Sequence, residues 1–169
     1  IQSLVKLSRM ESGIIAVHSE DTTIKQMLES IQQQFNVKVR EKNITLSLCD
    51  TDLHVRCDSK WTVEALGNIV DNAIKYTACG GNVQIKVEQY SFFVKIDIID
   101  DGIGIEKEEI PKIFGRFYRS LSVADQPGVG IGLFLAREII QAQKGYIKVT
   151  SEREKGSTFS VFLPISKKE

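Results

Sequence analysis

The stretch over residues 100–104, with the sequence DDGIG, constrains the fold most, because it places a carboxylate where an apolar strand face ends. Side chains in a strand alternate with a period of two, so Val94, Ile96, Ile98 and Asp100 share one face. An unpaired carboxylate on that face is costly to bury, so Asp100 needs a partner that donates hydrogen bonds. The glycines that follow let the main chain approach a ligand closely. The alternative is a polar turn, since Asp-Gly often ends a strand.

Length and composition indicate one globular domain. The chain has 169 residues, of which 42% are hydrophobic, and this is enough for a core. The 22 Lys and Arg residues balance the 22 Asp and Glu residues, so we expect no nucleic-acid partner. Cys49, Cys57 and Cys79 lack the paired spacing of metal ligands and suit a reducing compartment. The sequence has no signal peptide and no run of about 18 apolar residues. Because it begins at Ile1 inside an expected helix, we expect a fragment of a longer protein.

Hydrophobic periodicity predicts a mixed α and β chain. Helices are expected over residues 1–12, 24–42, 59–76, 106–113 and 132–143. Asp21 or Thr22 is expected to cap the helix that begins near residue 24, and Gly145 to end the last helix. Asp58 or Ser59 is expected to cap the helix over 59–76. Strands are expected over residues 14–18, 44–49, 54–57, 83–89, 92–100, 146–151 and 157–164.

The helix expected over residues 59–76 carries a polar stripe. Glu64, Asn68, Asn72 and Lys75 recur at the spacing of successive helical turns. A solvated face is the alternative, but asparagine forms helices poorly compared with Glu, Lys or Gln. Two asparagines one turn apart offer amide oxygens, which suit a hard cation such as Mg²⁺. Lys75 lies one turn further on and can neutralise phosphate.

A glycine-rich sequence opens the helix expected over residues 132–143. Gly128, Gly130 and Gly132 free the main chain, so that N–H groups and the helix dipole can face an anion. The GxGxG spacing differs from both the P-loop and the dinucleotide motif, and a flexible loop is the alternative. The segment between Gly104 and Gly128 is long for a compact domain, and such segments are usually functional or disordered.

The motifs follow one another in a fixed order along the chain. They are NxxxNxxKY over 68–76, DxGxG over 100–104, FxxFYR over 114–119, GxGxGL over 128–133 and GSTF over 156–159. In this order they closely resemble the catalytic ATP-binding domain of sensor histidine kinases, within the superfamily that includes gyrase-type ATPases and heat-shock chaperones. The resemblance covers residues 14–165. Residues 4–13 resemble the end of the second helix of that family's dimerisation and phosphoacceptor domain. Residues 1–13 would therefore be a remnant of that helix, and residues 14–169 the catalytic domain.

The resemblance implies an α+β fold of the Bergerat type. In this two-layer α/β sandwich, a mixed sheet of about five strands packs on three helices, with a mobile ATP lid. The implied ligands are ATP and Mg²⁺. Asp100 would accept a hydrogen bond from the adenine amino group, and Asn72, assisted by Asn68, would hold Mg²⁺. Lys75 and Arg119 would contact phosphate oxygens and, with Asn68, would be the catalytic residues.

Further residues would line the nucleotide site by the same resemblance. Phe114 and Phe117 would anchor the lid, and Thr158 would support the adenine pocket. The implied nucleotide-binding set is Asn72, Tyr76, Asp100, Gly102, Gly104, Ile105, Phe117, Gly128, Gly130, Gly132, Leu133 and Thr158.

The implied function is transfer of the γ-phosphoryl group of Mg-ATP to a histidine in the absent dimerisation domain. His18 and His54 do not match the phosphoacceptor motif and are expected to be structural or solvent-facing. The alternative is an ATP hydrolase or nucleotide-gated switch of the same superfamily. Such hydrolases have a glutamate base one turn before the metal asparagine, where this chain has Asn68, and Glu64 is the fallback base. A binding module without catalysis is a third possibility, which the complete motif set disfavours.

The implied partners are the upstream histidine-phosphoacceptor domain and the receiver domain of a response regulator. The fragment is expected to be a monomeric cytoplasmic domain. The full-length protein is expected to be a homodimer anchored in the bacterial cell membrane.

Overall fold

The computed structural model describes residues 5, 8, 16–119 and 130–166. Val5 and Ser8, in the first expected helix, are both helical. The rest of that helix, the part of the expected lid from residue 120 to Pro127, and Gly128 lie outside the described residues. Among the described residues, no helix combines the length and hydrophobicity needed to cross a membrane.

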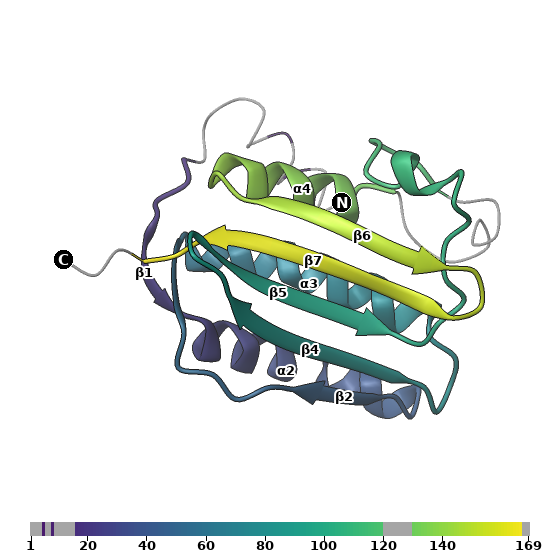
Figure 1. Cartoon of the computed structure of the whole chain (residues 1–169). Coiled ribbons are helices and arrows are strands. Elements are labelled where there is room, and N and C mark those ends of the chain that lie inside the picture. Colours follow the sequence, from purple (N-terminus) through teal and green to yellow (C-terminus); the bar gives the residue numbers. More distant parts are fainter. Residues whose placement is uncertain (1–4, 6–7, 9–15, 120–129, 167–169) are drawn as a thin grey trace.

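A mixed five-stranded sheet forms one layer of the domain (Figure 1). The strand order is β2-β4-β5-β7-β6, in which β2 and β4 are parallel and the other neighbours are antiparallel. The strands are β2 (Thr45–Leu48), β4 (Asn82–Gln89), β5 (Phe93–Asp100), β6 (Tyr146–Glu152) and β7 (Gly156–Pro164).

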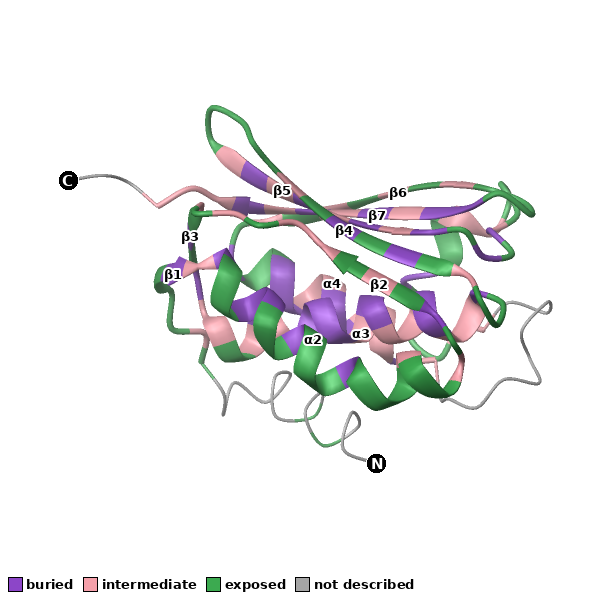
Figure 2. Ribbon diagram, turned by 90° about the horizontal axis from the view of Figure 1, so that it is seen from below, coloured by how far each residue is buried: buried purple, intermediate pink, exposed green. Residues whose placement is uncertain are grey.

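Among the described residues, three α-helices cover one face of this sheet (Figure 2). They are α2 (Ile24–Glu41), α3 (Ser59–Tyr76) and α4 (Gly132–Ala142). A separate antiparallel pair, β1 (Glu20–Thr23) and β3 (His54–Cys57), lies at one end of the domain. The expected α+β two-layer fold is therefore confirmed.

The core lies between the helices and the sheet. In α2, buried side chains recur at helical spacing and form one apolar stripe. In β5, buried residues alternate with partly exposed ones, so Val94, Ile96 and Ile98 face the helices. Asp58 caps α3 as expected, because its side chain accepts a hydrogen bond from the N–H of Trp61 at 3.1 Å.

The strand expected over residues 14–18 is absent from residues 16–18, and residues 14 and 15 lie outside the described residues. Residues 16–19 are irregular, and β1 begins at Glu20, where it pairs with β3. Asp21 and Thr22, expected as helix caps, therefore lie in a strand, and Thr23 precedes α2 without a side-chain capping bond. The reason is the long-range pairing with β3, which local hydrophobicity does not reveal.

Two helix predictions also need correction. In place of a helix over 106–113, a short 3₁₀ helix, η1 (Ile110–Lys112), is present. Pro111 has no N–H to donate, so it restricts helix formation in this segment. The helix α4 ends at Ala142, and the left-handed residue that follows is Lys144, at φ 62°, rather than Gly145.

Gln143 is a buried polar residue, only 5% exposed, and it directly follows α4. Its side chain joins the end of α4 to the start of α3. Its Oε1 accepts a hydrogen bond from the N–H of Asp58 at 2.5 Å, and its Nε2 donates to Oγ1 of Thr62 at 3.1 Å. Nothing local in the sequence indicated this role, because its partners lie about eighty positions earlier in the chain.

We expect Gln143→Leu to lower the free energy of unfolding by about 1–3 kcal/mol, because it removes the hydrogen bonds to the part-buried N–H of Asp58 and to the buried hydroxyl of Thr62. Urea denaturation monitored by circular dichroism measures this change. Gln141→Leu is the matched control, since Gln141 is an exposed glutamine two residues earlier, within α4. An equally small effect of both substitutions would contradict the structural role of Gln143.

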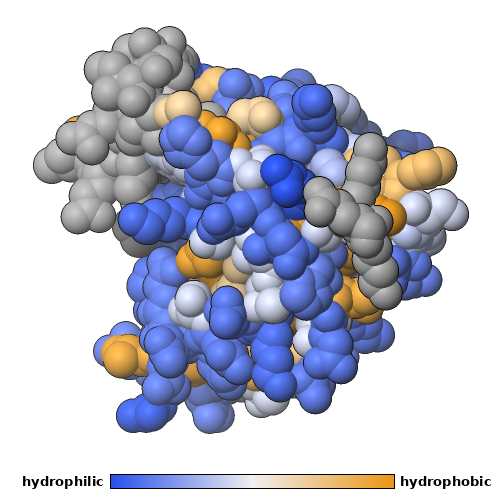
Figure 3. Space-filling model, turned by 90° about the vertical axis from the view of Figure 1, so that its left-hand side faces the viewer, coloured by the Kyte–Doolittle hydropathy of each residue, from blue (hydrophilic) through white to orange (hydrophobic). Residues whose placement is uncertain are grey.

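The end of the domain that carries β1 is mostly hydrophilic outside the grey atoms, with small, separate hydrophobic areas (Figure 3). A cavity of about 350 Å³ lies beside β1 and β3. It is lined by Thr23, Lys25, Gln26, Glu29, Thr51, Asp52 and His54. This cavity contains none of the expected site residues.

Candidate nucleotide-binding site

Asp100 lies at the end of β5 on the face that meets the helices, and it is 7% exposed. Its Oδ1 accepts a hydrogen bond from the N–H of Gly102 at 2.9 Å. The buried carboxylate thus already accepts a hydrogen bond from the protein's own main chain. The resemblance had assigned the hydrogen-bond donor to the adenine amino group. Burial raises the pKa of Asp100 above its ordinary value, although the N–H groups of Gly102 and Ser157 act in the opposite direction.

The DxGxG loop packs tightly against two other main-chain segments. A side chain at Gly102 would collide with the carbonyl oxygen of Tyr76, and one at Gly104 with that of Glu152. The N–H of Ile103 donates to the carbonyl of Tyr76 at 3.1 Å. The two glycines therefore let the loop fit between the end of α3 and the turn that joins β6 to β7.

The structure places Ser157, rather than Thr158, beside Asp100. Ser157 pairs with Asp100 across β5 and β7, and Thr158 pairs with Ile99. Paired residues project from the same face of a sheet, so Thr158 lies on the face opposite Asp100. The expectation that Thr158 supports the adenine pocket is therefore wrong. Ser157 is buried, and its Oγ lies 2.7 Å from Oγ of Ser151.

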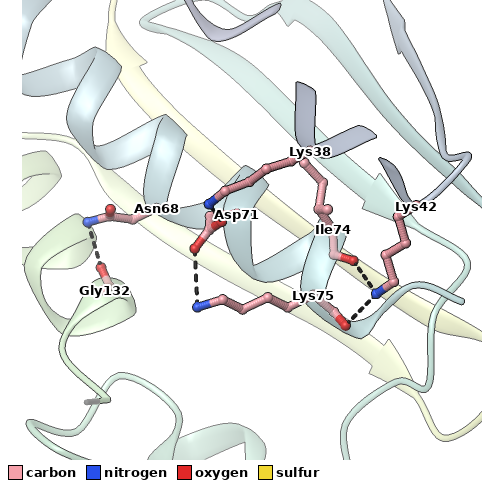
Figure 4. A network of polar contacts seen from close by, with 7 residues as sticks. All are labelled: Lys38, Lys42, Asn68, Asp71, Ile74, Lys75 and Gly132. Atoms are coloured by element: carbon pink, nitrogen blue, oxygen red, sulfur yellow. Dashed lines mark hydrogen bonds and ion pairs between the residues drawn. The ribbon is translucent and has the colours of Figure 1, made fainter. Parts of the chain in front are cut away.

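The polar stripe of α3 is half-buried along its length and does not form an ordinary solvated face. Its members are Glu64, Asn68, Asn72 and Lys75. The side-chain Nδ2 of Asn68 donates to the carbonyl of Gly132 at 3.1 Å and so joins α3 to the first turn of α4 (Figure 4). At Asn68, the stripe therefore contacts the start of α4.

Lys75 forms an ion pair within the same helix. Its Nζ lies 3.2 Å from Oδ2 of Asp71, and Nζ of Lys38 lies 2.8 Å from Oδ1 of the same carboxylate (Figure 4). Partial burial by itself would raise the pKa of Asp71, but the two lysines outweigh it and hold that pKa below its ordinary value. Asp71 is therefore ionised between two cations.

Tyr76 and Arg119 lie near each other at the end of α3. Partial burial raises the pKa of Tyr76, and the positive charge of Arg119 acts in the opposite direction. Arg119, the last described residue before position 130, is half-buried. The structure thus brings both residues to the end of the stripe that contains Lys75.

Phe114 anchors the base of the expected lid, whereas Phe117 does not. The ring of Phe114 is buried and packs edge-on against Phe159, with ring centres 6.3 Å apart. The guanidinium carbon of Arg137 lies 5.4 Å from the centre of the Phe114 ring. Phe117 has a left-handed backbone, at φ 61°, and its side chain is 55% exposed, so its expected anchoring role is wrong.

The remaining expected residues lie around this base. A side chain at Gly130 would meet the main chain of Phe117. The N–H of Ile105 donates to Oγ of Ser151 at 2.8 Å, and Leu133 packs partly buried against the core. The end of β5, the end of α3 and the start of α4, which carry most of the expected site residues, lie toward the end of the domain opposite β1 (Figure 1).

The donor set of this region suits a hard cation only together with an anionic ligand. Among the described residues, no group of three or more His, Cys, Asp or Glu side chains is arranged to hold a metal. With its Nδ2 bonded to Gly132, Asn68 retains its amide oxygen as an acceptor, and Asn72 offers a second one. Because both oxygens are neutral, Mg²⁺ would need the negative charge of phosphate as well.

Known proteins are similar to this chain in sequence and in fold. The family described as histidine kinase-, DNA gyrase B-, and HSP90-like ATPase matches residues 57–167. Over the whole chain, the sequence is 32% identical to the sensor histidine kinase WalK of Bacillus subtilis. It is 30% identical to the sensor protein kinase PmrB of Pseudomonas aeruginosa over 97% of the chain. The chain spans 28% of the length of WalK and 35% of that of PmrB.

A solved structure agrees with this assignment. The mycobacterial sensor histidine kinase MprB superposes with a TM-score of 0.77 at 25% identity, over 88% of this chain and 98% of the MprB chain. The chain belongs to the family of histidine kinase-, DNA gyrase B-, and HSP90-like ATPases and, within it, to the catalytic ATP-binding domains of sensor histidine kinases.

Proposed function

We propose that this domain binds Mg-ATP where β5 ends, and that its parent protein transfers the γ-phosphoryl group to a histidine. The observation that carries the proposal is Asp100, a buried carboxylate at the same end of the domain as the polar stripe of α3 and the start of α4. A solved structure with this fold, ShkA, was determined in complex with AMPPNP.

Asp100 recognises adenine in this proposal. One of its oxygens accepts the N–H of Gly102, which fixes the carboxylate plane and leaves acceptor capacity for the adenine amino group. The neighbouring Ser157 replaces Thr158 as the hydroxyl beside adenine, because it lies on the same sheet face as Asp100. Gly102, Gly104 and Ile105 hold the loop next to the base.

The phosphates lie between the stripe of α3 and the start of α4. Asn72 and Asn68 hold Mg²⁺ through their amide oxygens, and the metal neutralises charge on the phosphate oxygens. Lys75 and Arg119 bind phosphate oxygens directly, and Tyr76 lies beside the nucleotide. Gly128, Gly130, Gly132 and Leu133 belong to the lid that surrounds the phosphates, and Phe117, which is exposed, is available to contact nucleotide.

The reaction proposed is phosphotransfer rather than hydrolysis. A ring nitrogen of the acceptor histidine attacks the γ-phosphorus, the bond to the β–γ bridging oxygen breaks, and ADP leaves with the electron pair. Hydrolysis would need a carboxylate base at position 68. This residue is Asn68, whose side-chain Nδ2 donates a hydrogen bond to the carbonyl of Gly132. An ATP hydrolase or nucleotide-gated switch is thus the second candidate, with Glu64 as its base.

In this proposal, the phosphoacceptor histidine and the response regulator both lie outside this domain. The residues over 1–13 are the end of a dimerisation helix, residues 14–169 are the catalytic domain, and the acceptor histidine belongs to the upstream part. The kinase ThkA was solved in complex with the response regulator TrrA, which supports a receiver domain as the later phosphoryl acceptor. The parent is proposed to be a membrane-anchored homodimer with this domain in the cytoplasm.

The chain of 169 residues should bind ATP, hydrolyse it negligibly and acquire no acid-labile phosphate. It has a site for ATP, the phosphoryl donor, but neither of its histidines, His18 and His54, lies among the candidate site residues as a phosphoryl acceptor. Mixing it with the separate dimerisation domain should restore weak phosphohistidine formation, and covalent linkage should restore it strongly, because tethering raises the effective concentration. Radiolabel transfer from γ-labelled ATP measures both.

Asn68→Ala and Glu64→Gln distinguish the two candidate reactions. Rapid ATP turnover by the isolated chain that persists in Asn68→Ala but is lost in Glu64→Gln would favour the hydrolase. Transfer to the histidine domain without free phosphate release would support the kinase.

A further inference from the structure

The expected phosphate-binding lysine shares a carboxylate with a second lysine. Asp71 and Lys75 are one turn apart on α3, and Lys38 reaches the same carboxylate from α2 (Figure 4). The two lysines contact different oxygens of Asp71, Oδ1 for Lys38 and Oδ2 for Lys75. Withdrawal of Lys75 therefore leaves the contact with Lys38 intact.

The side chains of Lys38, Asp71 and Lys75 differ in their exposure to solvent. The side chains of Asp71 and Lys75 are 27% and 32% exposed, whereas that of Lys38 is 56% exposed. Lys38 thus approaches from the solvent side. A half-buried carboxylate without a counter-charge is unfavourable, so Asp71 needs at least one cation at all times.

Lys42, which directly follows α2, also holds the main chain at Lys75. Nζ of Lys42 donates to the carbonyl oxygens of Ile74 and Lys75, each at 2.8 Å (Figure 4). These bonds satisfy two carbonyls in the last turn of α3. The backbone of Lys75 is therefore fixed, and its ammonium group can change partner by side-chain rotation alone.

We propose that Asp71 is a positioning residue that holds the ammonium group of Lys75 until nucleotide binds, and that Lys38 is the counter-charge that permits its release to phosphate. The proposal rests on the function of Lys75 proposed above. Without Lys38, Asp71 would be left with Lys75 and would retain it. Without Asp71, Lys75 would be available to phosphate at all times.

The test compares the affinities for ATP and adenosine by calorimetric titration. Adenosine lacks phosphate, so the ratio of the two association constants isolates the phosphate contribution, and adenosine affinity reports an intact fold. Lys38→Met should lower this ratio about three- to fivefold, and Asp71→Asn should raise it by a similar factor, as expected for a partly exposed ion pair.

The opposite signs distinguish positioning from a purely structural ion pair. Breaking a structural pair from either side would weaken the fold and lower the affinities for ATP and adenosine together, so their ratio would not change. An unchanged ratio, or changes of the ratio with the same sign in both variants, would therefore overturn the proposal. Lys25→Met and Asp50→Asn are matched controls, since this lysine also extends from α2 and lies 3.3 Å from its aspartate; neither should change the ratio.

A Lys75→Met background separates the proposed mechanism from a general electrostatic effect. If Lys38 and Asp71 act through Lys75, their substitutions should no longer change the ratio in this background. Persistence of the effects would overturn the proposal, because it would indicate a direct field on the phosphates.

Failure of the proposed function would look different. If the wild-type chain binds neither ATP nor adenosine, the nucleotide site itself is wrong, and the role of Asp71 is overturned with it. If the wild-type chain binds both with equal affinity, the adenine site stands and the role of Lys75 and Asp71 is overturned.

Discussion

Asp100→Asn is expected to abolish measurable nucleotide binding while the domain remains folded. The amide can place an N–H donor against the amino donor of adenine, and a buried mismatch of this kind costs about 1–3 kcal/mol or more. This corresponds to a loss of affinity of roughly five- to a hundredfold or more. Calorimetric titration with ATP and with adenosine measures the loss, and wild-type affinity in the folded variant would refute the adenine role.

The variant should fold because ionisation of Asp100 opposes folding at neutral pH. Burial raises the pKa of Asp100 above its unfolded-state value. The contribution of this group to stability is therefore fully present below the unfolded-state pKa and is lost as the pH rises through the raised native pKa. A neutral side chain removes this cost, and its amide oxygen can still accept the N–H of Gly102.

Asp101→Asn is the matched control for this experiment. Asp101 is the adjacent aspartate, but it is exposed, and its carboxylate accepts hydrogen bonds from the main-chain N–H and the side-chain Nδ2 of Asn82. These bonds lower the pKa of Asp101, so its carboxylate stabilises the turn at neutral pH. The control should lose some stability and retain nucleotide affinity.

The same carboxylate predicts a pH dependence of adenosine binding. When Asp100 is protonated, it presents an O–H donor and loses the acceptor that adenine needs. Affinity should therefore fall as the pH decreases through the raised pKa of Asp100, above the range usual for aspartate. Adenosine is the suitable probe, because it carries no phosphate that titrates in this range.

Asn72→Ala is expected to weaken Mg-ATP binding much more than binding of metal-free ATP. The lost amide oxygen is a metal ligand in the proposed site, and its half-buried position on α3 makes general damage to the fold small. We expect a loss of about tenfold or more with Mg²⁺ and little change in the presence of a chelator. Because the donors are neutral, Mg²⁺ alone should not bind to the wild-type chain.

The control for this substitution is Asn36→Ala. Asn36 is an exposed asparagine in α2, so its loss should change neither affinity. An equal loss of ATP affinity with and without Mg²⁺ in Asn72→Ala would indicate damage to the pocket and would exclude a specific metal role.

Much of the fold was predictable, because helical and strand periodicity are local properties. The helix over 59–76 and the strand over 54–57 were predicted with the observed boundaries, since strong polar caps and regular apolar spacing mark them. The strand β1 was misplaced because it forms through pairing with β3, some thirty residues later in the chain. The apolar residues before it favoured a strand over 14–18, but the described residues 16–18 are irregular.

The site was predictable to the extent that its motifs are contiguous. Asn68, Asp100 and Gly132 were identified from short patterns, and the structure brings them to one end of the domain. The hydroxyl beside adenine was assigned to Thr158, one residue away from Ser157, and a shift of one residue along a strand exchanges the two faces of a sheet. The residues next to Gln143 in the sequence do not predict its burial, because its partners Asp58 and Thr62 are distant in the chain.

The sequence by itself determined the fold class, the helix that carries the polar stripe, the end of β5 at Asp100 and the order of the motifs. Only the tertiary structure decided which hydroxyl lies beside Asp100 and which cations surround Asp71. The physical reason is range. Spacing along one helix or strand determines which of its own residues share a face, whereas the contact of Lys38 with Asp71 depends on how two helices pack.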